Sequence, residues 1–122
     1  MKRGPDADLV YLSHMIKCIN RVLEYCEGGE LSFRQSHLIQ DAVIRNLQTM
    51  AESSQRLSEF TKAIASDVPW RAISGFRNII VHDYLGVDLD LDMVWQVVSS
   101  DLPLLQAALL KIDLAPEKRI PC

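Results

Sequence analysis

Arg77-Asn78-Ile79-Ile80-Val81-His82-Asp83-Tyr84 is the stretch that decides the fold, because it sets a cation, an imidazole and a phenol along two turns of an otherwise apolar helix. This helix is expected to begin near Pro69, whose missing N–H costs nothing in a first turn. It is expected to end at Gly86, because glycine favours the left-handed backbone that stops helices. The polar cluster therefore lies at the end of an element, where a site is open to solvent.

Upstream of this stretch, the sequence predicts a first amphipathic helix from Asp6 to about Glu27. Its apolar residues recur at steps of three and four, which is the spacing of one helix face. The stripe consists of Leu9, Leu12, Ile16, Ile19, Leu23 and Cys26. Gly28-Gly29 is expected to end the helix, since two glycines lose too much backbone entropy to continue it.

A second, long helix is predicted between the glycines and Pro69. Ser32 and Gln35 have the spacing of a capping box, and neither proline nor glycine interrupts the chain from there to Pro69. The pattern therefore predicts one helix of about thirty residues. An almost heptad spacing indicates packing along its whole length, at Val43, Leu47, Met50, Leu57 and Ile64.

The C-terminal third predicts one further helix with an interruption. Asp88, Asp90 and Asp92 precede its first apolar residues, and carboxylates there are better explained as caps than as a calcium loop, which needs further oxygen ligands. Asp101-Leu102-Pro103 then forces either a kink or a fresh start with Asp101 as the cap. The apolar stripe continues beyond it at Leu105, Leu109 and Ile112.

These elements predict an all-α protein, an antiparallel bundle of four helices, or five if Pro103 divides the last one. With 48% hydrophobic and 24% charged residues, the 122 residues suit a single helical domain over 1–122. Its core is expected over about residues 6–112, followed by a flexible C-terminal tail.

The net charge, the apolar runs and the cysteines limit which partners and which cellular compartment are expected for this chain. A net charge of −3 argues against coating nucleic acid by bulk electrostatics, and it leaves room for a small basic cleft doubled by dimer symmetry. The apolar runs are too short to cross a bilayer and the N-terminus lacks a secretory core, so a cytoplasmic protein without membrane contact is expected. Cys18 and Cys26 lie eight residues apart on one helix, roughly 12 Å by helical rise, and are expected to be buried thiols.

Arg77 and His82 offer a specific chemistry. Histidine, with a reference pKa of about 6.5, removes or returns protons near neutral pH. Arginine stays charged and its planar fork suits two phosphate oxygens. Together they suffice to cleave RNA without a metal. Five residues of regular helix place the two side chains about 140° apart, however, so they meet one ligand only if the arginine curls across or the helix loosens.

The same residues also have a structural interpretation. An arginine and a histidine near a helix end are commonly a surface cation and a cap or core histidine, because the spacing is a short pattern. Tyr84 alone is typical of a packed aromatic with a wet hydroxyl. His14 and His37 have no comparable neighbours and are interpreted as surface or partly buried structural residues.

The whole constellation resembles the HEPN superfamily, and within it the HepT-like toxins. Those proteins carry R-x4-H-x-Y, which stands here as Arg77, His82 and Tyr84. The resemblance spans roughly residues 6–112 and includes residues 41–47, residues 69–76, Trp95 and residues 101–103.

The resemblance implies a homodimer whose two R-x4-H motifs face a shared cleft and cleave RNA without metal or other cofactor. It assigns phosphate binding to Arg77, acid or base catalysis to His82, and supporting roles to Asn78 and Asp83. It further implies the toxin of a type VII-like toxin–antitoxin system, silenced when a cognate minimal nucleotidyltransferase antitoxin transfers AMP to Tyr84.

One departure and two alternatives accompany this resemblance. Gln48 and Ala51 stand where the family carries a glutamate and a glycine, whereas Glu52 is kept. A non-catalytic helical adaptor, with the polar cleft as a nucleotide or partner site for a nucleotidyltransferase, is the first alternative. A purely structural dimerisation bundle is the second.

Overall fold

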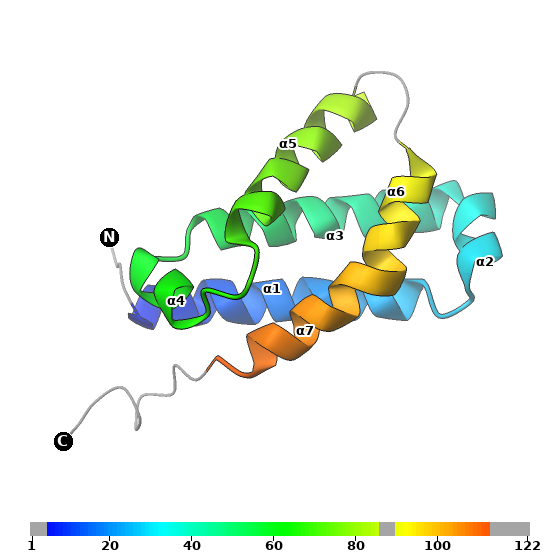
Figure 1. Cartoon of the computed structure of the whole chain (residues 1–122). Helices are drawn as coiled ribbons and strands as arrows, with labels where there is room; N and C mark the ends of the chain where they lie inside the picture. The colour runs from blue at the N-terminus through cyan, green and yellow to red at the C-terminus, as the bar shows by residue number, and fades with distance from the viewer. Residues whose placement is uncertain (1–4, 86–89, 113–122) are drawn as a thin grey trace.

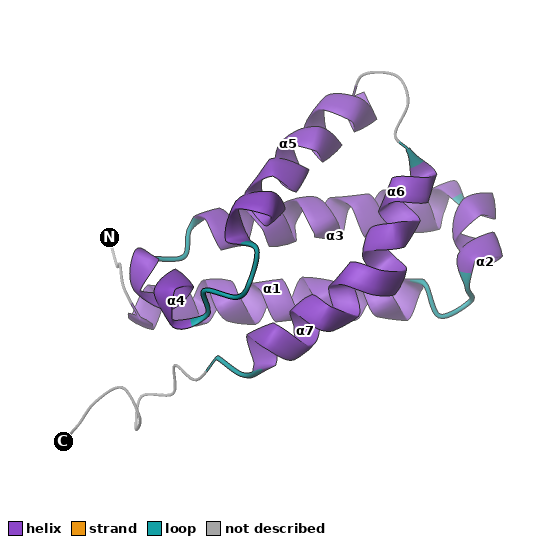
Figure 2. Cartoon of the chain, viewed as in Figure 1, coloured by secondary structure: helices purple, strands orange, loops and turns teal. Residues whose placement is uncertain are grey.

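The computed structural model describes residues 5–85 and 90–112, with side chains described for 7–82 and 90–112. Within these ranges every regular element is a helix (Figure 2), which confirms the all-α prediction. The elements are α1 Pro5–Tyr25, α2 Glu30–Gln35, α3 His37–Gln55, α4 Glu59–Ile64, α5 Trp70–Leu85, α6 Leu91–Gln96, the π-helical turn η1 Val97–Asp101 and α7 Leu102–Leu110.

Helices α1 and α3 form the base of the fold, running antiparallel and packed along their lengths (Figure 1). Helix α5 rises from one end of α3 and packs against it, whereas α6, η1 and α7 descend as one continuous rod whose lower part contacts α1. The shared core is formed by apolar side chains that are almost fully buried, among them Met15, Ile19, Val22, Phe33, Val43, Leu47, Ile80, Val94, Leu102 and Leu109.

The predicted long second helix is wrong, because the chain breaks it into α2, α3 and α4. The first break lies at Ser36, whose backbone is extended and whose hydroxyl accepts a hydrogen bond from the Ile39 amide at 3.1 Å. Gln40 donates to the carbonyl oxygens of Phe33 and Arg34, which satisfies the free end of α2. Ser36, rather than Ser32, is therefore the helix cap.

The short helix α2 places one aromatic side chain, that of Phe33, in the core. Phe33 is fully buried and its ring lies 5.5 Å from that of Trp95, centroid to centroid. Such a pair is stabilising beyond the area it buries. Gly29 precedes α2 with a φ of 94°, a left-handed conformation suited to glycine, and this confirms the predicted end of the first helix.

The second break depends on a buried carboxylate from α1. Asp8 is 1% exposed and accepts three hydrogen bonds, from the Ser58 amide at 2.9 Å, the Ser58 hydroxyl at 2.5 Å and the Thr61 hydroxyl at 2.5 Å. These contacts fix the start of α4 against the start of α1. Leu57, in the link between α3 and α4, is buried as predicted. Ile64 is 53% exposed and does not continue the predicted apolar stripe.

The C-terminal rod does not start afresh at Asp101, since α6, η1 and α7 follow one another without a break, so the second of the two predicted outcomes is wrong. Asp101 has helical backbone angles and makes no capping hydrogen bond. The chain widens into the π turn η1, where the Leu102 amide bonds to the Val97 carbonyl. A proline clashes with the carbonyl four residues before it in a regular helix, and the wider turn before Pro103 relieves that clash.

The predicted aspartate cap of this rod is confirmed at Asp90. Its carboxylate accepts from the amides of Asp92 at 3.0 Å and Met93 at 3.3 Å. Asp92 instead pairs with Arg34 of α2. Asp88 lies outside the described residues.

One helical run in the described part of the chain, Leu91–Leu110, is long and apolar enough to cross a membrane by length and composition alone. Core helices of soluble proteins can have the same length and composition. Val94, Val98, Leu102 and Leu109 are buried in the shared core, which makes the run one of the packed helices of this fold.

Asp8→Ala is expected to lower the free energy of unfolding by about 2–3 kcal/mol, because it leaves the buried Thr61 hydroxyl and the half-buried donors of Ser58 without their acceptor. Urea denaturation followed by circular dichroism measures this. Glu24→Ala removes an exposed carboxylate from the same helix and should change stability by less than about 0.5 kcal/mol. Equal midpoints for the two variants would show that Asp8 does not anchor α4.

Candidate active site

Arg77 turns from α5 toward α3, where it meets Glu52. Its Nε and Nη2 each donate to the same oxygen, Glu52 Oε2, at 3.3 Å. Both side chains are about one third exposed, at 35% and 34%. The ion pair therefore sits at the edge of the α3–α5 contact, with one side open to solvent.

Two amide side chains extend this contact. Gln48, one turn before Glu52 on α3, donates its Nε2 to Glu52 Oε2 at 3.2 Å. Asn78 places its Oδ1 3.5 Å from Arg77 Nη1. The same carboxylate oxygen thus receives donors from α3 and α5, and the guanidinium is contacted on two of its edges. We call Gln48, Glu52, Arg77 and Asn78 the arginine cluster.

His82 lies apart from the arginine cluster. It is exposed near the C-terminal end of α5, and within the described side chains no hydrogen bond or ion pair joins it to Arg77. Helix α5 is regular across both positions, so the predicted separation of about 140° applies. One copy of the chain therefore brings Arg77 together with Asn78 and Glu52, and it does not bring Arg77 together with His82.

Asp83 and Tyr84 belong to the last turn of α5 by their backbone. Their side chains lie outside the described part of the chain, so their predicted roles remain predictions. The backbone alone keeps Tyr84 seven residues beyond Arg77 on a regular helix, which places the two positions on neighbouring parts of one stripe.

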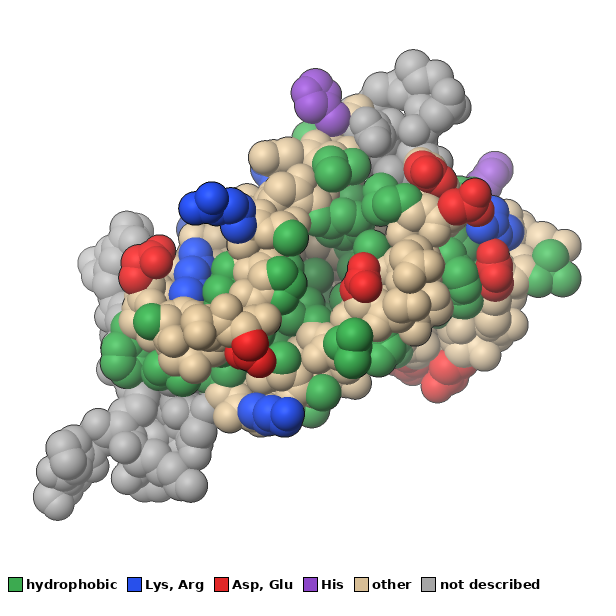
Figure 3. Space-filling view, viewed as in Figure 1, with side chains coloured by type: hydrophobic (Ala, Val, Ile, Leu, Met, Phe, Trp, Pro, Cys, Tyr) green, Lys and Arg blue, Asp and Glu red, His purple; other side chains and the backbone are tan. Residues whose placement is uncertain are grey.

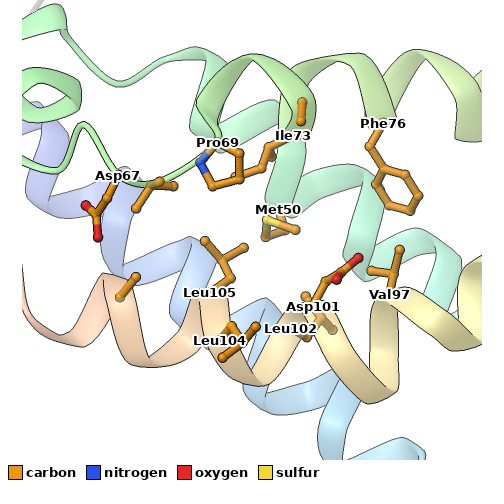
Figure 4. Close-up of a pocket in the computed structure, with 13 residues that line it drawn as sticks. Met50, Asp67, Pro69, Ile73, Phe76, Val97, Asp101, Leu102, Leu104 and Leu105 are labelled. Atoms are coloured by element: carbon orange, nitrogen blue, oxygen red, sulfur yellow. The ribbon is translucent and has the colours of Figure 1, made fainter.

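An apolar hollow, lined by none of the residues of the arginine cluster, opens between α5 and the C-terminal rod (Figure 3). Its volume is about 500 Å³ and its walls include Ile73 and Phe76 from α5 and Val97 and Leu105 from the rod, with Met50 of α3 among its lining residues. Asp101 and Asp67 are the charged residues that line it (Figure 4). The hollow is suited to an apolar partner surface and offers little to a phosphate.

A further polar cluster in the described chain joins α1 to α3 and fits a structural role. His14 is half-buried, with its Nδ1 2.6 Å from Ser53 Oγ and its Nε2 3.5 Å from Cys18 Sγ. His37 is exposed, so both histidines fit their structural interpretation. Cys18 and Cys26 are buried free thiols, as predicted, and burial raises the pKa of the Cys26 thiol.

Glu52 is the site residue that sequence reasoning left without a role. Its partner Arg77 lies 25 positions away in the sequence. The periodicity of apolar residues does not reveal a contact between two helices that are so far apart in the chain. One signal was present, since Gln48 and Glu52 are four residues apart and share a face of α3. The site therefore includes two residues of α3 in addition to the motif on α5.

Comparison with known proteins gives consistent matches. Residues 15–112 match the family described as Ribonuclease HepT-like. The chain is 29% identical over 105 residues to the protein named "Probable ribonuclease HepT" of Thermococcus cleftensis, with 84% of this chain and 92% of the relative covered. A Methanocaldococcus jannaschii protein named as a candidate RNase is 31% identical over 94 residues, with 76% of this chain and 84% of the relative covered.

A larger protein of Methanocaldococcus jannaschii is 35% identical over 104 residues, and its name combines a gamma-glutamylcyclotransferase with a candidate RNase. The match covers 84% of this chain but 46% of that relative, so this chain spans about half its length. No solved structure gives a significant match.

Arg77→Ala and Glu52→Ala are each expected to lower the free energy of unfolding by less than about 1 kcal/mol, because an ion pair this exposed contributes little to stability. Leu47→Ala, fully buried on the same helix α3, should cost about 2–5 kcal/mol. Urea melts of the three variants test this. A loss at Arg77 as large as that at Leu47 would contradict the prediction.

Proposed function

Because the chain belongs to the Ribonuclease HepT-like family, we propose that it is a metal-independent endoribonuclease that acts as a homodimer in the cytoplasm. Arg77 binds the scissile phosphate and His82 transfers protons. The observation that carries the proposal is that the family match extends over residues 15–112. Arg77 and His82 both lie on α5 within this range.

The chemistry follows from the two side chains. The neutral imidazole of His82 takes the proton of a ribose 2′-hydroxyl, and the 2′-oxygen then attacks the adjacent phosphorus. The bond from phosphorus to the 5′-oxygen breaks, and that oxygen receives a proton from an imidazolium. The products are a 2′,3′-cyclic phosphate and a 5′-hydroxyl. Arg77 stabilises the charge that develops on the phosphate oxygens.

Two features support a site shared between two copies. Arg77 points toward α3 whereas His82 is exposed about 140° around α5, so a partner's histidine completes the site more readily than the same chain's. Apolar surface is also uncovered beside α5: Ile79 is 46% exposed and the hollow next to Phe76 is open. A second copy packed on this side buries that surface and doubles the cationic groups at the cleft.

Tyr84 is proposed as the switch of a type VII-like toxin–antitoxin system. A cognate minimal nucleotidyltransferase binds ATP, and the phenol oxygen of Tyr84 attacks the α-phosphorus of this ATP. Pyrophosphate leaves and the phenolic proton is released. The AMP adduct places bulk and phosphate charge on the stripe that also carries Arg77. Repulsion of RNA phosphate from this part of α5 then silences the nuclease.

His82→Ala and Arg77→Ala are each expected to reduce RNA cleavage by at least about 100-fold, since each removes one half of the proposed chemistry. Cleavage of labelled RNA with excess chelator is the measurement. His37→Ala removes an exposed histidine of α3 and should leave the rate unchanged. Full activity in His82→Ala, or dependence of the wild-type protein on added metal, would refute the mechanism.

Co-expression with the cognate nucleotidyltransferase should add AMP to the wild-type chain and abolish the growth arrest that the chain causes alone. Intact-mass analysis detects the adduct. Tyr84→Phe should lose it and remain toxic, whereas Tyr25→Phe, a change at an exposed tyrosine of α1, should keep it. A stable complex without growth arrest or adduct would instead favour the adaptor alternative.

A further inference from the structure

We infer that Glu52 is the positioning residue for the proposed cleavage: it holds the Arg77 guanidinium in the orientation that presents its free edge to the RNA phosphate. This inference rests on the proposed function. Glu52 does not touch the substrate in this role, and it acts through Arg77.

The contact geometry is the first ground. Glu52 Oε2 accepts from both Nε and Nη2 of Arg77 at 3.3 Å, so it engages one edge of the planar guanidinium and fixes the plane of the group. Asn78 contacts Nη1, and the N–H groups that neither residue uses remain on the open side. An arginine side chain that is otherwise free to rotate is thereby restricted to one direction at the α3–α5 edge.

The placement of Glu52 is the second ground. A carboxylate near an RNA phosphate is unfavourable by charge alone, because it offsets the cation that binds the substrate. Exposed ion pairs also add little to stability. The Arg77–Glu52 pair therefore contributes little to the stability of the fold. Its presence is explained by the orientation that it gives to the guanidinium.

Gln48 supports this arrangement one step further from the substrate. Its Nε2 donates to the same Oε2 at 3.2 Å, from one turn earlier on α3. The carboxylate is therefore itself held between two donors on its own helix and on α5. A carboxylate held in this way keeps its acceptor oxygen aimed at Arg77 through the reaction.

Steady-state kinetics of Glu52→Ala separates positioning from simple charge effects. Positioning predicts that kcat falls about 10- to 100-fold, since a small misplacement of a catalytic group has effects of this size. KM should not rise, because one negative charge near the RNA has been removed. Glu52→Gln keeps an acceptor oxygen in place and should recover part of the lost kcat. Glu24→Ala, the matched exposed carboxylate on α1, should change neither constant.

A double-mutant cycle adds a readout that a structural role does not move. Gln48→Ala should lower kcat by a smaller factor, and its effect should vanish in the Glu52→Ala background, because it acts through that carboxylate. An unchanged or raised kcat in Glu52→Ala, with active wild-type protein, overturns the inference and leaves the proposed function standing. A wild-type protein that cleaves no RNA overturns both.

Discussion

The packing of α3 between α1 and α5 is the constraint on which the rest of the structure depends. Val43, Leu47 and Ala51 of α3 are fully buried, and α3 contacts both α1 and α5. Helices in proteins gain most of their stability from packing an apolar face, so this burial supplies most of the stability of α3. The half-buried polar residues at the edge of this packed surface, Gln48 and Glu52, are joined by a hydrogen bond of 3.2 Å.

The short helices show how tertiary contacts override a local pattern. Nothing between Ser32 and Val68 breaks a helix by itself, since the segment lacks proline and glycine. The breaks arise where a side chain gains more from a distant partner than from a continuous helix. Phe33 gains burial against Trp95, and Ser58 and Thr61 gain the carboxylate of Asp8. Each such partner lies in a different part of the chain.

In the proposed function, an acidic protein must bind RNA, a substrate that also carries negative charge. A net charge of −3 gives no general attraction to RNA, so binding depends on a few cations in defined positions. The arginine cluster gives Arg77 such a position, although the nearby carboxylate reduces its net attraction. The proposed mechanism therefore relies on orientation within the site more than on bulk electrostatic capture, and in the proposed homodimer a second copy of the site adds local positive charge.

The sequence by itself determined the all-α class, the extent of the first helix, the start of α5, the glycine stop before Glu30, the cap at Asp90 and the R-x4-H-x-Y pattern. These are local properties, set by periodicity, backbone preference and residue type within one or two turns. The tertiary structure alone decided the breaks at Ser36 and Ser58, the π turn before Pro103 and the pairing of Arg77 with Glu52. These depend on which segments meet in space, and a contact between positions 25 apart leaves no periodic trace in the chain.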